Sequence, residues 1–274
     1  MTRLLILAGF SALAVTQAET GARELLPTPG IVARAGVASP TRSPWIVASG
    51  WRFIRHPGAR FRYELPAGKA SLAMAEKFAY DADAVLQTDP ADADALRAFA
   101  AFVGSLPPSR LPAIADFGVV DDGSAVTGEV MNLLARRNLL YAVVKAPEPR
   151  YPLNVAVGTR EFPAEEAADP SAFALKVRRL LTDDRRSLRV YGSELVIGRL
   201  TGDAAQVRLH LINYGGREID GLRVRVRGGF AGGHVYIAGA GRSALVDHVV
   251  AGGATEFSLP RFGVYAVVDL SAAR

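Results

Sequence analysis

The chain has 274 residues and a formal net charge of +5; 50% of its residues are hydrophobic and 22% are charged. This composition is close to the average of folded proteins, which excludes a disordered, collagen-like or disulfide-rich chain. Because the sequence contains no cysteine, disulfide bonds, thiolate metal sites and cysteine nucleophiles are excluded as well.

The first 18 residues have the pattern of a secretory signal peptide. Arg3 precedes an apolar run over residues 4–15, and small residues then lead to Ala18. The run is shorter than the roughly 20 residues of a transmembrane helix. We therefore expect residues 1–18 to be removed and the protein to be secreted or periplasmic, with no membrane span after signal removal. The alternative is a buried N-terminal helix.

A linker or extended arm is expected over residues 19–44, which are rich in Pro, Gly, Thr and Ala without a steady period. Ordered structure is expected to begin at Trp45. Residues 45–53 predict a strand that Gly50 bends.

Two helices are expected next. Apolar residues at spacings of three and four from Leu72 to Ala82 predict the first helix. Asp89, as N-cap, and Pro90, as the first helical residue, predict the start of the second.

A strand, a turn, a helix and a second strand then follow closely, at residues 113–120, 121–124, 129–138 and 140–144. This order is typical of a βαβ unit, whose two strands are parallel. A helix over residues 169–181 completes this part of the chain. We therefore expect residues 45–186 to form a small three-layer α/β domain with a mainly parallel sheet.

From residue 187 onward the pattern changes to period-two alternation between Gly-rich turns. Leu222, Val224 and Val226, for example, alternate with arginines. About seven short strands are predicted, at residues 193–200, 207–211, 222–226, 234–238, 245–250, 256–259 and 265–270. Their number and spacing predict that residues 187–274 form an immunoglobulin-like β-sandwich.

Several segments resemble multi-domain β-galactosidase-like glycosidases. Residues 207–214, 255–260 and 263–270 are similar to the C-terminal β-sandwich of these enzymes. Residues 116–124 and 132–141 resemble their glutamine-amidotransferase-like middle domain. The resemblance implies that the chain corresponds to the rear portion of such an enzyme.

The chain also departs from this family in two respects. It has no cysteine, so amide transfer through a cysteine nucleophile is excluded. The 142 residues from Trp45 to Arg186 are too few for a (β/α)₈ barrel of about 250 residues. Residues 69–87 resemble only the last helix region of such a barrel, so the resemblance places no pair of catalytic carboxylates.

Candidate catalytic groups are Asp121 and Asp122, in the turn after a predicted strand, together with Glu64. Ligands of open α/β sheets bind at the carboxyl ends of strands, where these aspartates could serve as acid, base or cation ligands. The alternative, which we prefer, is that residues 121–124 form a turn and a helix start, with side chains that accept backbone N–H groups.

A saccharide-binding platform is the second candidate site. Trp45, Trp51, Arg52 and Tyr63 lie in an aromatic-rich stretch, and aromatic faces can stack on sugar rings. Core packing is the alternative use of these residues, and we prefer it.

A third candidate is the row formed by Arg223, Arg225 and Arg227, which share one strand face and could hold anionic headgroups. We prefer to interpret these arginines as solvated charges on an edge strand. The four histidines lack the helical spacing of a zinc motif. We predict no metal site and no cofactor.

Three functional hypotheses follow. The first, which we prefer, is an exported non-catalytic accessory protein related to glycosidase domains that contacts carbohydrate or a partner protein. The second is a glycoside hydrolase, or a fragment of one, that uses paired carboxylates of the α/β part. The third is an assembly module that binds a protein partner or forms a homo-oligomer through the α/β domain. A nucleic-acid partner is not expected, because the basic residues are scattered.

Overall fold

The computed structural model describes residues 4–7, 26–28, 32–38, 44–193 and 195–273. Most of the expected signal peptide, and much of the expected linker over residues 19–44, therefore lie outside the described residues. Of residues 1–18, only Leu4–Leu7 are described, as strand β1.

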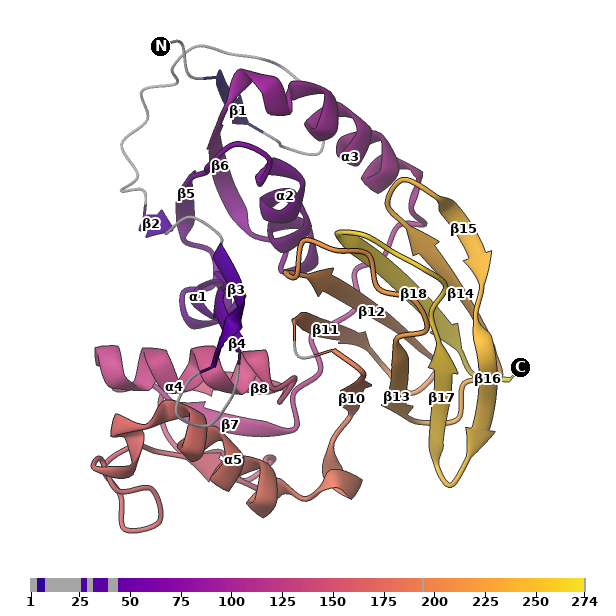
Figure 1. Cartoon of the computed structure of the whole chain (residues 1–274). Coiled ribbons are helices and arrows are strands. Elements are labelled where there is room, and N and C mark those ends of the chain that lie inside the picture. The colour runs from indigo at the N-terminus through magenta and orange to yellow at the C-terminus, as the bar shows by residue number, and fades with distance from the viewer. Residues whose placement is uncertain (1–3, 8–25, 29–31, 39–43, 194, 274) are drawn as a thin grey trace.

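The first part of the chain mixes helices with short strands (Figure 1). Its strands are β1 (Leu4–Leu7), β2 (Leu26–Thr28), β3 (Val32–Ala38), β4 (Pro44–Val47), β5 (Arg60–Glu64), β6 (Asp83–Thr88), β7 (Phe117–Val120), β8 (Tyr141–Val144) and β9 (Asn154–Val155). Its helices are α1 (Gly50–Arg55), α2 (Ala70–Ala79), α3 (Ala93–Ser105), α4 (Ala125–Arg136) and α5 (Pro170–Leu181), with short 3₁₀ turns at Pro90–Asp92, Glu166–Ala168 and Asp183–Arg185.

The parallel strands of this part form two separate sheets. One has the order β1-β6-β5-β2, in which β2, β5 and β6 are parallel and β1 is antiparallel. The other has the order β8-β7-β9 and is wholly parallel. The expected parallel strand direction is confirmed, but within the described residues the strands do not join into the one continuous sheet that we expected.

The predicted strand over residues 45–53 is wrong in its second half, because residues 50–55 form helix α1. The helix packs closely on its neighbours. A Cβ added to Gly50 would lie 2.3 Å from the ring of Tyr80, and one added to Gly128 would lie 3.1 Å from the ring of Trp51. These two glycines let α1 pack against Tyr80 and α4, and this packing overrides the strand preference of the aromatic residues.

The other helices agree better with their sequence signals. Ser124 accepts a hydrogen bond from the Thr127 N–H and caps α4. Asp169 caps α5, which ends at Leu181 as expected. The predicted helix at Asp89–Pro90 begins as a 3₁₀ turn and continues as α3.

The C-terminal part consists of antiparallel strands. They are β10 (Leu188–Tyr191), β11 (Val196–Gly202), β12 (Gln206–Asn213), β13 (Arg223–Arg227), β14 (Gly232–Ile237), β15 (Gly241–Ala244), β16 (Val246–Ala251), β17 (Ala254–Ser258) and β18 (Tyr265–Ser271). They form a four-stranded sheet, β10-β13-β17-β16, and a five-stranded sheet, β11-β12-β18-β14-β15. The seven predicted strands are all present, and the sequence reading missed β10 and β15.

The middle of the five-stranded sheet is buried on both faces, whereas its edge strand β15 is exposed. Val196 and Leu200 of β11 belong to the apolar core shared with the four-stranded sheet, whereas Ile197 belongs to the core formed with helices α2 and α3. Figure 1 shows α2 and α3 beside this sheet. Polar residues on the helix-facing side, such as Arg208 and His210, are therefore buried too.

Arg223 and Arg227 are exposed, so these arginines are solvated as expected, but the interpretation of their strand as an edge strand is wrong. Strand β13 lies inside the four-stranded sheet, between β10 and β17. Arg223 and Arg225 both approach Glu256 on the neighbouring strand, at 2.5 Å and 3.7 Å. Arg223 and Arg225 thus share a carboxylate within their own sheet, whereas Arg227 donates to the carbonyl of Arg185.

None of the helices in the described ranges is long and apolar enough to cross a bilayer.

Candidate functional site

A cleft of about 410 Å³ opens between β4, α1, α4 and the start of α5. We call it the α4 cleft. Its polar lining comes from Arg52, Glu129, Asn132, Arg136, Asp169 and Ser171. Apolar atoms of β4, Leu133 and Pro170 complete its walls. The volume lies within the range of small-molecule sites.

Helix α4 supplies three of these side chains from one face. Glu129, Asn132 and Arg136 are separated by three and four residues, so they lie above one another along the helix. Val130 and Leu134 point into the core and have no exposed surface. The amphipathic pattern of α4 therefore directs the polar row toward the cleft.

Helix α1 supplies Arg52, whose guanidinium group lies 4.3 Å from the centre of the Trp51 ring. Arg52 also donates a hydrogen bond of 3.3 Å to the carbonyl of Ala48. Burial lowers the pKa of Arg52, and the negative charges of Glu129 and Glu76 partly oppose that shift. An arginine remains charged after such a shift, so the cleft holds a cation next to a carboxylate.

Arg136 and Asn132 complete the polar wall. Burial lowers the pKa of Arg136, and Glu129 opposes the shift. Arg136 donates to the carbonyl of Ile46, which ties α4 to β4. The Asn132 side chain donates to Glu129 at 3.3 Å, and its own buried oxygen has no hydrogen-bond partner among the described residues. A buried polar atom without a partner is unusual in a folded protein.

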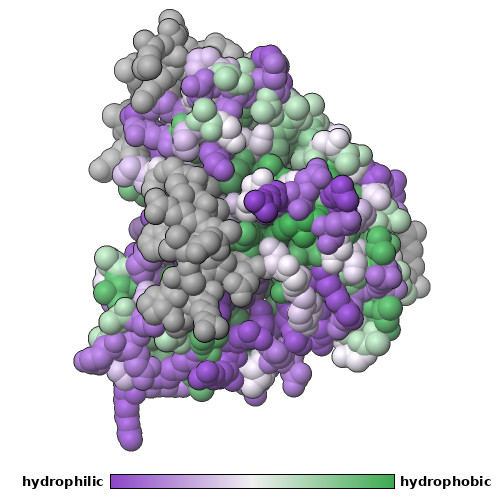
Figure 2. Space-filling model, viewed as in Figure 1, coloured by the Kyte–Doolittle hydropathy of each residue, from purple (hydrophilic) through white to green (hydrophobic). Residues whose placement is uncertain are grey.

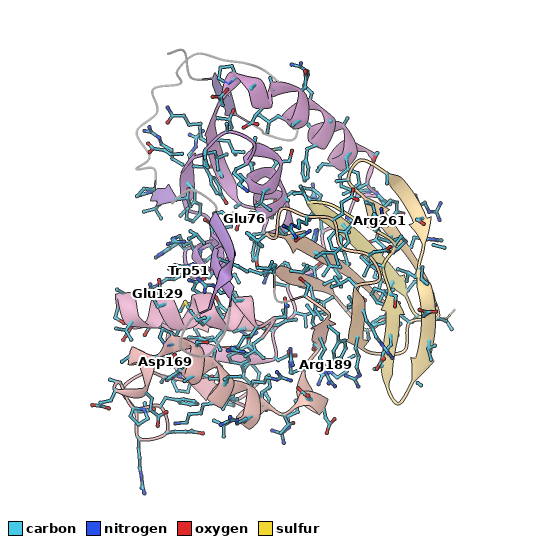
Figure 3. The ribbon with its side chains drawn as sticks, viewed as in Figure 1. Trp51, Glu76, Glu129, Asp169, Arg189 and Arg261 are labelled. Carbon is cyan, nitrogen blue, oxygen red and sulfur yellow. The ribbon has the colours of Figure 1, made fainter. Side chains whose placement is uncertain are left out.

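Asp169 lines the cleft, and its carboxylate also caps helix α5. One of its oxygens accepts the N–H groups of Ser171 and Ala172, at 3.1 Å and 3.0 Å, and so caps α5. This leaves Glu129 as the cleft carboxylate that caps no helix in the described structure. Figure 3 shows Trp51 on α1, Glu129 on α4 and Asp169 at the start of α5. Figure 2 shows a mainly hydrophilic surface over α5.

The sequence candidates Asp121 and Asp122 lie at the start of α4, outside the residues that line the α4 cleft. Asp121 forms a two-point ion pair with Arg55, with distances of 2.7 Å and 3.0 Å, and accepts the Gly123 N–H. Asp122 accepts the Ser124 N–H at 2.9 Å. Burial alone would raise the pKa of Asp121, but these hydrogen bonds and the charge of Arg55 outweigh it and lower the pKa.

Glu64, the third carboxylate candidate, ends strand β5 and is exposed. It pairs with Arg62 on the same strand at 3.1 Å. It belongs to the sheet of β5 and β6, whereas Asp121 follows β7 in the other parallel sheet. The structure does not bring Glu64 into the α4 cleft.

The candidate saccharide platform is divided between the core and the cleft. Arg52 lines the α4 cleft, Trp51 is buried against α4, and Tyr63 has no exposed surface. The backbone of Trp45 belongs to β4, and its side chain lies outside the described part of the structure.

Glu76 is a buried carboxylate that the sequence reading missed. One oxygen accepts the Ser49 N–H at 2.7 Å and the hydroxyl of Tyr214, and the other accepts the Tyr63 hydroxyl at 2.6 Å. Burial raises the pKa of Glu76, and these hydrogen bonds oppose the rise. With no exposed surface, Glu76 cannot touch a ligand. It joins α1, β5 and the end of β12, as its position in Figure 3 indicates.

The residues of the cleft that were missed carried a weak signal in the sequence. The polar row of α4 is visible as spacings of three and four within a helix that was expected over residues 129–138. The sequence pattern did not predict what this row faces, because residues 45–53, which include Arg52 of the opposite wall, were expected to form a strand. In the described ranges, no group of three histidine or acidic side chains is placed to hold a metal ion.

Comparisons with known proteins bear on the fold. No protein-family model matches the sequence, and no curated protein matches it. Among solved structures, the chain is similar to α-L-fucosidase isoenzyme 2 from Paenibacillus thiaminolyticus, with a TM-score of 0.58 and 9% identity over 79% of this chain and 60% of that one. A rhamnosidase from Novosphingobium sp. PP1Y matches with a TM-score of 0.46 and 12% identity over 78% of this chain and 32% of that one.

The fucosidase match shows that the chain has a glycosidase-like fold. The chain spans less than two thirds of the length of either enzyme. At such low identity the similarity extends to the fold alone.

Proposed function

We propose that this protein is an exported, non-catalytic accessory protein related to glycosidase domains, and that it contacts carbohydrate through the α4 cleft. One observation carries the proposal: Arg52, Arg136, Asn132 and Glu129 converge in a cleft of about 410 Å³. Sugar hydroxyls both donate and accept hydrogen bonds, and guanidinium, amide and carboxylate groups supply the complementary partners. The glycosidase-like fold agrees with this ligand class.

The non-catalytic role is supported by what the candidate acids already do. Most glycosidases need two carboxyl groups held on opposite sides of the scissile bond. Asp121 is paired with Arg55, Asp122 accepts a backbone N–H, and Asp169 caps α5. Each of these carboxylates therefore already has a structural role at a turn or at a helix start.

The finer family relationship is part of the proposal. We propose that the α/β part corresponds to the glutamine-amidotransferase-like middle domain of β-galactosidase-like glycosidases. The C-terminal part would then correspond to their immunoglobulin-like β-sandwich. Two antiparallel sheets around one apolar core support the second correspondence.

Carbohydrate binding is tested by calorimetric titration of the full chain with a panel of neutral and acidic oligosaccharides. We expect at least one to bind, and we expect Glu129→Gln to weaken that binding about tenfold, since hydrogen bonds to a charged group are stronger than those to a neutral one. Glu64→Gln is the matched control, because Glu64 is exposed and remote from the cleft. Equal weakening by both variants, or no binding at all, would reject the α4 cleft as a carbohydrate site.

The glycoside hydrolase alternative is tested with aryl glycosides. We expect no turnover above the buffer blank from the wild-type chain. The Asp121→Asn/Asp122→Asn double variant and Glu129→Gln separate the possible acids if turnover is found. Turnover that one of these variants abolishes without loss of folding would establish an enzyme and reject the non-catalytic role.

Export is tested separately. We expect intact-mass analysis of the protein from the periplasm or the culture medium to give a chain that begins at Glu19. Strand β1 pairs with β6 through residues 4–7, so cleavage after Ala18 would free this edge of β6. Recovery of the uncleaved chain only from the cell interior would reject export.

Contact with a protein partner through the α/β part is the remaining component of the proposal. Light scattering of the purified chain distinguishes a monomer from a homo-oligomer. A monomer that binds no oligosaccharide would direct the search to a different protein as the partner.

A further inference from the structure

A second cavity, of about 420 Å³, lies where helix α1, strand β8 and strand β11 come together. We call it the Arg199 pocket. Its lining includes five aromatic side chains and one arginine, namely Phe53, Phe61, Tyr80, Tyr141, Tyr151 and Arg199. It shares no lining residue with the α4 cleft.

Arg199 is the unusual group of this pocket. It lies on the helix-facing side of β11, and its guanidinium group sits over the Tyr80 ring, 5.3 Å from the ring centre. The buried Nε has no hydrogen-bond acceptor, and no carboxylate among the described residues lies within ion-pairing distance of the group. A guanidinium group presents five in-plane donors, and contact of its flat face with a ring satisfies none of them.

Two other arginines whose side chains are buried have acidic partners. Arg55 pairs with Asp121 at 2.7 Å, and Arg208 pairs with Asp269 at 2.6 Å. An unpaired charge is costly in proportion to its burial, and Arg199 is half-buried. Arg199 therefore differs from these arginines in a way that an anionic ligand would correct.

The groups nearest to Arg199 do not offset its charge. Burial lowers the pKa of His210, which lies opposite Arg199 on β12, to about 3, and the charges of Arg208 and Arg199 add to the effect. The imidazole is thus neutral at ordinary pH. Burial also raises the pKa of Tyr80 to about 12 and that of Tyr141 above its usual value, so both phenols are neutral.

Two aspartates also line the pocket, and both are exposed residues next to other cations. Asp83 lies 3.7 Å from Arg60. The charges of Asp83 and Asp81 both act on Lys77, whose pKa burial lowers and these charges raise. Asp83 is therefore paired away from Arg199, and among the described residues neither aspartate forms an ion pair with Arg199.

The aromatic walls are held in place by their neighbours. The rings of Phe53 and Phe61 meet edge to face with their centres 4.7 Å apart, and the rings of Phe53 and Tyr80 are 5.9 Å apart. Tyr80 also lies so close to Gly50 that any side chain there would collide with it. A preformed cavity with aromatic walls favours a flat or ring-shaped ligand body.

We propose that the Arg199 pocket binds a small carboxylate carried on a ring, either a uronic acid or an aromatic acid, with the carboxylate paired to the Arg199 guanidinium. A carboxylate matches the two-pronged donor geometry of arginine. The ring would lie against the aromatic walls. The site is separate from the carbohydrate contact proposed for the α4 cleft and stands without it.

Calorimetric titration of the full chain with glucuronate, benzoate, glucose and sulfate tests the proposal. We expect glucuronate or benzoate to bind and glucose and sulfate not to bind. Glucuronate binding alone identifies a sugar acid, and benzoate binding alone identifies an aromatic acid. Failure of both carboxylates to bind, or equal binding of glucose, overturns the proposal.

Variants locate the binding site. We expect Arg199→Gln to weaken carboxylate binding about tenfold to a hundredfold. Arg199→Lys keeps the positive charge but loses the two-pronged donor geometry of the guanidinium group, so we expect it to weaken binding less. Arg225→Gln is the matched control, because Arg225 is a partly buried arginine of the other sheet. If Arg199→Gln does not fold, Arg199→Lys carries the test. Unchanged binding in the folded Arg199 variants, or equal weakening by Arg225→Gln, overturns the assignment. Glu129→Gln should leave this binding unchanged, which separates the outcome from that of the α4 cleft.

Discussion

The middle of the five-stranded sheet has two buried faces, and they are built from different chemistry. The face toward the four-stranded sheet is apolar throughout its core, with residues such as Leu209, Leu211 and Val268 fully buried. The face toward α2 and α3 mixes apolar side chains with buried polar ones, including His210 and the hydroxyl of Tyr214 that donates to Glu76.

This difference separates two physical roles. Apolar burial stabilises in proportion to area but is not directional. A buried hydrogen-bonded group contributes less net stability, yet it is costly when its partner is misplaced. We infer that the apolar face holds the two antiparallel sheets together, while the polar face fixes the position of the helices on the sheet. The following variants test that division, beginning with the largest expected effect.

Leu209→Ala should have the largest effect on stability. Leu209 has no exposed surface and lies in the middle of β12, on the apolar face. Removing its side chain leaves a cavity that sheet residues cannot fill, which should lower the free energy of unfolding by about 3–5 kcal/mol. Urea denaturation measures the change. Val249→Ala is the control, because Val249 is 55% exposed and should change stability by less than about 0.5 kcal/mol. A loss below about 1 kcal/mol for Leu209→Ala would contradict the role of the apolar face.

Glu76→Ala should destabilise the protein by about 3 kcal/mol, because it leaves the donors of Ser49, Tyr63 and Tyr214 buried without an acceptor. Urea denaturation of Glu76→Ala and of Tyr214→Phe measures how much the hydrogen bonds to Glu76 contribute to the free energy of unfolding. The single lost donor in Tyr214→Phe should cost clearly less. An equal loss in the two variants would mean that Glu76 is held by Tyr214 alone.

Glu76→Gln sharpens this test through pH. Burial raises the pKa of Glu76 in the folded protein, so the folded state holds its proton more tightly than the unfolded state does. The stability contributed by the protonated group is complete below the unfolded pKa, and it declines as the pH rises through the folded pKa. The stability of the Gln variant relative to the wild type should therefore improve as the pH rises above about 4.3, the usual glutamate value. Denaturation at several pH values measures this difference, and a difference that does not change with pH would contradict the raised pKa.

The period-two strands show how much of the fold could be predicted from the sequence. Val224 and Val226 alternate with arginines and point into the core as expected, because strand geometry alone decides which face each residue takes. The same rule fails for His210, which alternates correctly but is buried, since helices α2 and α3 cover the face that the pattern treats as exposed. A period-two pattern predicts which residues share a face of the strand, but it does not predict which other elements pack against that face.

The failures at the site have a similar cause. Residues 50–55 carry strand-favouring aromatic residues but form α1, because Gly50 and Gly128 permit close packing that local propensity does not describe. With α1 misassigned, the cleft between Arg52 and the polar row of α4 could not be foreseen. The cap at Ser124 was foreseen, because a capping signal depends only on residues within one helical turn.

Asp116→Ala tests the second polar contact between the α/β part and the antiparallel strands. Both oxygens of Asp116 accept the Ser187 N–H, at 3.1 Å and 3.0 Å, and one also accepts the Ser187 hydroxyl at 2.6 Å. The contact fixes the start of β10 beside β7. Its loss should cost about 2 kcal/mol, because the N–H and hydroxyl of Ser187 are then left buried without a partner. Urea denaturation measures the loss, and Asp122→Ala, an exposed N–H acceptor, is the control. A cost no greater than that of the control would contradict a role in joining the two parts.

Glu256→Gln should have the smallest effect, although it removes a charge that two arginines approach. Arg223 lies 2.5 Å and Arg225 lies 3.7 Å from Glu256, but the Arg223 side chain is 63% exposed and the carboxylate is one-third exposed. Water screens such a pair, so the change in unfolding free energy should be below about 1 kcal/mol. Because the contact is electrostatic, the difference between variant and wild type should shrink further when the salt concentration is raised from about 0.1 M to about 1 M. Urea denaturation at the two salt concentrations checks both points. A loss as large as that of Asp116→Ala, unchanged by salt, would place this solvent-facing ion pair among the contacts that hold the fold together and would contradict its screening by water.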